Sequence, residues 1–127
     1  MDIVNRDRAA PFITKDGSTI REILAPRNSV IARQSLAEAT LPPGQTTQAH
    51  RHPAIEEIYY ILRGEGLMRL GGEERAIGPG DGVAIPPAAP HQIRNTGAAD
   101  LVFLCCCVPA YEHDDTVMVA PLFPGDI

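Results

Sequence analysis

Residues 44–64 read GQTTQAHRHPAIEEIYYILRG and carry the pattern that decides the fold. His50 and His52 stand two positions apart, so on an extended strand both side chains project to the same face. Pro53 ends that strand, because proline cannot donate a hydrogen bond to a β-ladder. The run 57–62 that follows is rich in β-branched and aromatic residues, which favour strands. The stretch therefore predicts two β-strands separated by a turn, with two imidazoles on one face.

Pairs and triplets of glycine and proline divide the rest of the chain into short segments. Such clusters break helices and mark turns, and they lie at 42–44, 64–66, 71–72, 78–80 and 86–87. The segments between them that we predict as strands are 18–24, 31–41, 46–52, 67–70, 74–77, 83–85, 91–95 and 101–108. No stretch has convincing helical periodicity. Short strands at this spacing are typical of an all-β sandwich or barrel.

Composition limits the classes of function. The chain has 127 residues, a length that predicts one domain, and its 21% charged and 44% hydrophobic residues are ordinary for a globular protein. The net charge is −5 and the arginines are scattered, which argues against a nucleic-acid partner. No apolar run approaches the roughly 20 residues of a membrane helix. With no apolar signal region at the N-terminus, a cytoplasmic location is the expectation.

Three histidines and a carboxylate are spaced so that a barrel can bring them to one metal ion. The second informative stretch, 80–95, reads GDGVAIPPAAPHQIRN, and its rigid loop delivers His91 to the start of another strand. The turn at Pro53 resets the alternation of faces, so either Glu56 or Glu57 can point inward. Three imidazoles and one carboxylate suit a divalent transition metal with open positions, and manganese, iron, nickel, zinc and copper all accept this set.

The two stretches resemble the two sequence motifs of the cupin family. The first matches Gly-x5-His-x-His-x4-Glu-x6-Gly at Gly44, His50, His52, Glu57 and Gly64. The second matches Gly-x5-Pro-x-Gly-x2-His-x3-Asn at Gly80, Pro86, His91 and Asn95, with Ala88 where the motif has glycine. As a pair the motifs are highly specific, and the departure at Ala88 bears on the conformation of a loop and not on a ligand.

The resemblance implies a jelly-roll barrel, the double-stranded β-helix of the cupins. It implies one cupin domain over 1–127, with a core barrel at about 18–108 between an N-terminal arm and a C-terminal tail. It favours Glu57 over Glu56, because only Glu57 has the six residues before Gly64 that the motif requires. The implied metal ligands are His50, His52, Glu57 and His91.

Three further side chains are predicted to contact a substrate. Arg33 shares strand parity with Ser35 and could bind an anion at the barrel mouth, although an outward Arg33 with Gln34 turned inward is the alternative. Gln48 has the parity of the first two histidines. Tyr59 has the parity of Glu57 and could donate its hydroxyl, or serve only as a core aromatic.

The cysteines at 105–107 and His113 each have two possible interpretations. Cys105 and Cys107 share one face of a predicted strand and Cys106 lies on the other, so this run is no disulfide framework. The ordinary interpretation of these cysteines is that they are buried thiols of the core. The functional interpretation is that one of them contributes a thiol to the metal site. His113 stands in an acidic segment that is either a solvated turn or a cover over the barrel mouth.

The strand at 57–62 is apolar on both faces, from Ile58 to Leu62. A strand with one face in water would alternate between apolar and polar residues. Something therefore covers the outer face, either the second sheet of a sandwich or a partner subunit, and for the latter we expect a homodimer.

These observations favour an enzyme acting on a small oxygen-rich or carboxylate substrate that chelates the metal, by oxygenation, decarboxylation or isomerisation. Lys15 is the sole lysine of the sequence, which argues against a sugar-phosphate substrate. The alternatives are a non-catalytic small-molecule sensor or binding module and, third, a barrel that needs no metal.

Overall fold

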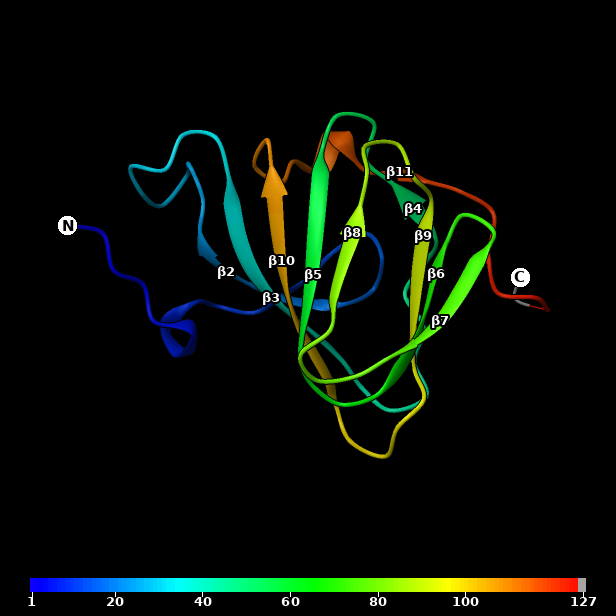
Figure 1. The fold of residues 1–127 in the computed structure, drawn as a ribbon. Helices are drawn as coiled ribbons and strands as arrows, with labels where there is room; N and C mark the ends of the chain where they lie inside the picture. The colour runs from blue at the N-terminus through cyan, green and yellow to red at the C-terminus, as the bar shows by residue number, and fades with distance from the viewer. Residues whose placement is uncertain (126–127) are drawn as a thin grey trace.

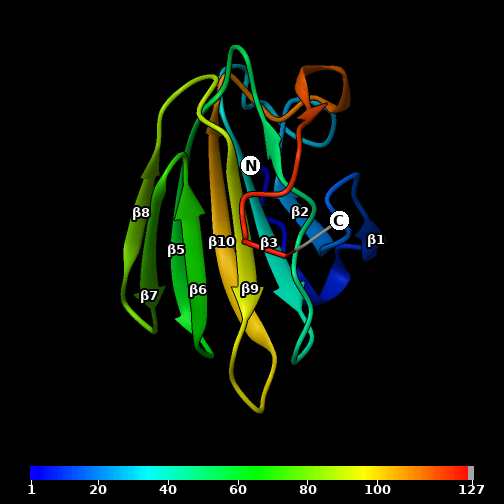
Figure 2. The same cartoon turned by 90° about the vertical axis from the view of Figure 1, so that its right-hand side faces the viewer.

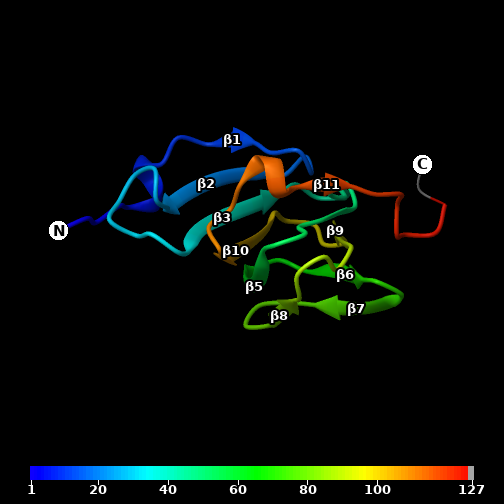
Figure 3. The ribbon, with the colours of Figure 1, turned by 90° about the horizontal axis from the view of Figure 1, so that it is seen from above.

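The computed structural model describes residues 1–125, and in them the chain forms two antiparallel β-sheets packed face to face (Figures 1 and 3). The larger sheet has six strands in the order β1 (Phe12–Ile13), β2 (Thr19–Leu24), β3 (Ser35–Leu41), β10 (Leu101–Val108), β5 (Glu56–Arg63) and β8 (Gly82–Ile85). The smaller has five, in the order β11 (Val117–Met118), β4 (His50–Arg51), β9 (His91–Asn95), β6 (Gly66–Leu70) and β7 (Glu73–Ile77). The predicted all-β jelly-roll barrel is confirmed.

Two short 3-10 turns complete the described elements, η1 (Arg6–Arg8) and η2 (His113–Asp115). No helix among residues 1–125 has the length and hydropathy needed to cross a membrane. The two ends of the described chain lie on opposite sides of the barrel (Figure 3). The last two residues of the predicted tail, 126–127, lie outside the described residues.

The core fills the space between the two sheets, and Figure 2 shows the smaller sheet in front of the larger. Strand β5 alternates strictly, with Glu57, Tyr59 and Ile61 buried and their neighbours exposed. Ile61 packs in one cluster with Phe103 of β10 and with Ile93 of β9 on the opposite sheet. Each fully buried side chain of this size contributes about 1.5–3 kcal/mol to folding. The inward face of β5 therefore passes from the apolar core at Ile61 to a carboxylate at Glu57.

The predicted strand at 31–41 is wrong over its first four residues, because β3 begins only at Ser35. The preceding segment is held as a turn instead. The amide of Ala25 donates to the Asn28 side chain, and the Ser29 hydroxyl donates back to the Ala25 carbonyl. Asn and Ser side chains commonly stabilise turns by such local hydrogen bonds.

The predicted strand at 46–52 is also shorter, reduced to the two residues of β4 and an isolated bridge at Thr46. Thr47 explains the interruption, because its hydroxyl accepts the hydrogen bond of the Ile93 amide that a strand carbonyl would otherwise take. The short strand β1 was not predicted; it lies in the N-terminal arm and pairs with β2 across a turn at 14–18.

Candidate metal centre

The four side chains predicted as metal ligands come together inside one end of the barrel. Pairing of β4 with β9 sets His50 directly opposite His91. One ring nitrogen from each of His50, His52 and His91 lies within 4.8 Å of the others, and all three imidazoles are buried. Glu57 Oε1 lies 3.6 Å from His52 Nε2 and 3.5 Å from His91 Nε2. The site is at the end of β5 that is uppermost in Figure 1, beside η2.

Each imidazole is fixed by a main-chain carbonyl. The carbonyl oxygens of Gln48, Asp115 and Ala89 accept hydrogen bonds from Nδ1 of His50, His52 and His91, at 2.8, 3.1 and 3.0 Å. A carbonyl can only accept, so in the neutral ring the proton sits on Nδ1 and the Nε2 lone pair is free. Metal-binding histidines are oriented in this way in known sites. All three rings therefore present an unprotonated nitrogen to the same centre.

Two buried polar atoms lack a hydrogen-bond partner among the described residues, and they face each other across this centre. They are Glu57 Oε1 and His91 Nε2. An unpaired buried acceptor costs about 1–3 kcal/mol, so native structures rarely leave two together. Ligand atoms bound at about 2.1 Å from one metal lie about 3.0–3.5 Å apart, close to the separation found here. The donor set and its spacing fit a divalent transition metal.

Burial keeps His50 in the form that a metal needs. Desolvation lowers the pKa of His50, and the neighbouring His91 lowers it further, although Asp16 acts in the opposite direction. A lowered pKa favours the neutral imidazole, which is the ligand form. His113, by contrast, is exposed on η2 and does not belong to the buried group.

The alternation of β5 decides between the two glutamates in favour of Glu57, which is buried, while Glu56 is exposed. The other carboxylate oxygen of Glu57, Oε2, is held by a hydrogen bond from the neighbouring strand. The Cys107 thiol donates to Glu57 Oε2 at 3.3 Å, because β10 pairs with β5 so that these two residues stand opposite each other. Burial, and then the Glu57 carboxylate, raise the pKa of Cys107, so the thiol keeps the proton that it donates.

Of the other two cysteines, Cys105 joins Cys107 inside the barrel and Cys106 lies on the opposite face, as the strand parity predicts. Burial raises the pKa of Cys105, and the Glu57 carboxylate raises it further. Both interior cysteines are therefore protonated thiols. Cys107 donates a hydrogen bond to Glu57, and Cys105 lines the cavity.

A cavity extends from the histidines to the barrel mouth. Of the three side chains predicted to contact a substrate, one lines this cavity. Tyr59 lines it, buried between Phe103 and His91 with ring centroids 4.6 and 5.8 Å away. Arg33 is exposed in the turn before β3, outside the cavity lining. Gln48 is likewise exposed, because the strand that gave it the parity of the histidines begins only at His50.

Sequence reasoning missed several polar side chains of the cavity, among them Asp16, Tyr111 and Thr116. Asp16 comes from the turn between β1 and β2, and its Oδ2 lies 3.9 Å from His50 Nε2. Tyr111 and Thr116 come from the C-terminal segment around η2, and the Thr116 hydroxyl lies 3.3 Å from His52 Nδ1. No spacing relates any of them to the two motifs, since each reaches the site through the packing of a distant segment.

The match to known proteins covers the residues of this centre. A family model described as a cupin domain matches residues 37–107, which include all four candidate ligands. An uncharacterized protein of Methanocaldococcus jannaschii is 51% identical over 110 residues, covering 87% of this chain and 88% of that protein.

Two relatives from Thermotoga maritima have more informative descriptions. The oxalate-binding protein is 40% identical over 72 residues, which cover 57% of this chain and 60% of that protein. The crystal structure of a predicted oxalate decarboxylase has a TM-score of 0.75 and 30% sequence identity, covering 85% of this chain and 99% of that one.

Proposed function

This chain belongs to the cupin domain family, and from that premise we propose that it holds one divalent transition metal and acts on a small oxygen-rich or carboxylate molecule. The proposed ligands are His50, His52, Glu57 and His91. The observation that carries the proposal is the pair of unpartnered buried atoms, Glu57 Oε1 and His91 Nε2, 3.5 Å apart. A shared cation would satisfy both of them without further rearrangement.

The residues around this centre have separate tasks. The three histidines, held by main-chain carbonyls, fix the ligand geometry before any metal arrives. Cys107 holds Glu57 Oε2, which leaves Oε1 directed at the histidines. Tyr59 and Phe103 supply an apolar wall that excludes water from the inner end of the cavity. A bound divalent metal would supply Lewis acidity to an oxygen atom of the substrate, and iron would add oxygen chemistry.

Of the reaction classes open to such a site, oxygenation, decarboxylation and isomerisation, the similarity to a predicted oxalate decarboxylase supports decarboxylation. The similarity to an oxalate-binding protein supports the second candidate, a non-catalytic binding module or sensor built on the same metal centre. Turnover of a bound compound separates the two. A cytoplasmic location and the lack of a nucleic-acid partner stay predictions.

Elemental analysis of untagged protein purified without chelator tests the proposed metal. We expect about one transition metal per chain, removed by dialysis against a strong chelator, with a fall in thermal stability after removal. A ligand present at about 100 times its dissociation constant stabilises the folded state by about 2.7 kcal/mol. Protein that holds no metal, even after reconstitution with manganese, iron, nickel, zinc and copper in turn, would leave the metal-independent barrel as the better description.

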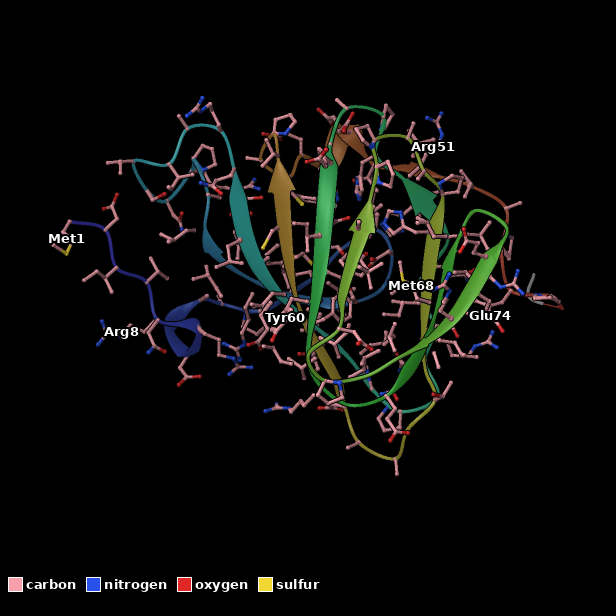
Figure 4. All side chains as sticks on the ribbon, in the orientation of Figure 1. Met1, Arg8, Arg51, Tyr60, Met68 and Glu74 are labelled. Atoms are coloured by element: carbon pink, nitrogen blue, oxygen red, sulfur yellow. The ribbon has the colours of Figure 1, made fainter. Side chains whose placement is uncertain are left out.

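We further propose that the outer face of the six-stranded sheet is covered by a second copy of the chain. Ile58, Tyr60 and Leu62 of β5 are 50%, 44% and 42% exposed on this face, and Val108 of the adjacent β10 is 50% exposed (Tyr60 is labelled in Figure 4). Contiguous exposed apolar side chains of this kind mark protein interfaces.

Light scattering coupled to size-exclusion chromatography is expected to return twice the chain mass of 13.7 kDa. Tyr60→Arg, which places a charge in the centre of the patch, should shift the mass to that of one chain. Met118→Arg is the matched control, because Met118 is an exposed apolar residue of the other sheet and lies outside the patch. A wild-type mass of one chain at micromolar concentration would refute the dimer.

A further inference from the structure

Asp16 brings a second carboxylate to the centre, from a segment outside both sequence motifs. Its Oδ1 accepts three hydrogen bonds within the turn at 14–18: from the Thr14 hydroxyl at 2.8 Å, and from the Ser18 amide and hydroxyl at 2.8 and 2.6 Å. Its Oδ2 takes no part in these bonds and lies 3.9 Å from His50 Nε2, the nitrogen that faces the centre. The turn therefore holds Oδ2 beside the position of any molecule bound next to the histidines.

The charges that face the cavity are negative. Asp16, Glu22 and Glu57 line it, and none of the described lining residues is a lysine or an arginine. The nearby Arg27 is engaged by Glu22, with hydrogen bonds of 2.7 and 2.9 Å to its two carboxylate oxygens. A divalent metal at the centre would be balanced by Asp16 and Glu57. A dicarboxylate would then add two unbalanced charges to a site of low dielectric, where uncompensated charge is costly.

Several apolar side chains also line the cavity. They include Ile20, Ala39 and Phe103, together with Phe12, which is 41% exposed. A molecule that fits would present an apolar body to these side chains and a polar group to the centre. The carboxylates thus offer hydrogen-bond acceptors to a bound molecule, and no lysine or arginine faces them from the described lining to hold an anion.

We propose that the cavity takes a small uncharged molecule that carries hydroxyl groups on an apolar or aromatic body, with Asp16 Oδ2 accepting a hydrogen bond from one of those hydroxyls. The inference rests on the proposed metal centre and narrows its substrate to the uncharged oxygen-rich class, for which oxygenation or isomerisation, and not decarboxylation, is the reaction. Asp16 is the residue that selects this class over dicarboxylates, because its charge attracts the hydroxyl proton and repels an anion.

Binding of two probes to the cobalt-loaded protein tests the inference under nitrogen. Catechol is an uncharged aromatic diol at neutral pH, and oxalate is a dianion. Calorimetry gives each affinity, and the visible absorption of cobalt reports whether the probe enters the metal site. The variant is Asp16→Asn, whose amide oxygen can keep the hydrogen bonds of the turn while the negative charge is lost. Asp114→Asn is the matched control, because it removes an exposed carboxylate of η2 outside the cavity lining.

We expect the wild type to bind catechol at least about tenfold more tightly than oxalate, the discrimination that one hydrogen bond to a charged group supplies. Asp16→Asn should weaken catechol about tenfold and strengthen oxalate, and Asp114→Asn should change neither. Equal or tighter binding of oxalate by the wild type, no binding of catechol, or an unchanged ratio in Asp16→Asn would each overturn the inference. Cobalt uptake is measured first. Protein that takes up no cobalt would refute the metal centre itself, whereas cobalt uptake followed by a preference for oxalate would refute only the substrate class.

Discussion

Protein carrying His91→Ala is expected to contain no bound metal and to have lost at least about 100-fold in metal affinity. Replacing groups that only orient a metal ligand costs 10–100-fold, and His91 is itself proposed as a ligand. The imidazole is 1% exposed, and its Nε2 is one of the two unpartnered atoms of the centre. Alanine removes that nitrogen and leaves Glu57 Oε1 with two imidazoles in place of three.

Metal content by elemental analysis and metal affinity by competition with a chromophoric chelator measure this effect. Metal added to His91→Ala should no longer raise the melting temperature. His113→Ala is the matched control, since His113 is an exposed histidine outside the buried group and should leave one metal per chain. Stoichiometric metal retained by His91→Ala would show that the binding site lies elsewhere.

The second large effect is expected for Gly64→Ala, which should lower the free energy of unfolding by about 2–5 kcal/mol. Gly64 has a φ of 92°, where a side chain costs about 1–2 kcal/mol. A Cβ there would also lie 2.6 Å from the carbonyl oxygen of Asp100 and 2.8 Å from the Cα of Leu101. Both neighbours are main chain and cannot rotate away, so overpacking adds about 1–3 kcal/mol.

Urea denaturation followed by circular dichroism measures the change, and Gly71→Ala separates its two causes. Gly71 also has a positive φ, 55°, but a Cβ there would meet no atom within 4 Å. It should lose about 1 kcal/mol, the cost of the backbone conformation alone. Equal losses of stability in the two variants would mean that the close approach of the Asp100 loop adds nothing to the cost of a side chain at Gly64.

The motif positions of this chain divide into ligands and residues that shape the loops between them. Asn95 is an example of the second kind: its side-chain amide donates to the carbonyls of Leu41 and Ala99, and its oxygen accepts from the Gly97 amide. Gly64 packs against the same loop at Asp100. Both positions were predicted from the resemblance to the cupin motifs, since their partners Leu41 and Asp100 lie in other segments of the chain.

Periodicity predicted that His50 and His52 share a face, and both are buried. It left Glu56 and Glu57 open; the motif resemblance favoured Glu57, which the alternation along β5 buries. The same rule failed for Gln48, because the alternation breaks at Ala49 and His50, which are both buried, and β4 begins only at His50. It failed for Arg33, because the chain stays irregular after the turn at 26–28 and β3 begins only at Ser35.

Asp16 and Thr116 could not be predicted, because neither belongs to the periodic part of the barrel. Asp16 is placed by the pairing of β1 with β2, and by the hydrogen bond from the Gln48 amide to the Asp16 carbonyl. Thr116 is placed by the C-terminal segment, where the Asp115 carboxylate accepts from the amides of Ala54 and Ile55. Contacts between residues so distant in sequence depend on the whole tertiary structure and leave no local signal.

The three carbonyl anchors of the imidazoles have a consequence for how the proposed centre would acquire a metal. A centre whose ligands are already oriented has little conformational entropy left to lose when an ion enters. Closely related divalent ions then compete on intrinsic affinity, which rises from manganese to copper for a site of this kind. Occupancy in a cell would follow the supply of each ion as much as the preference of the barrel. The same polypeptide, expressed in media of different metal content, would be recovered as chemically different proteins.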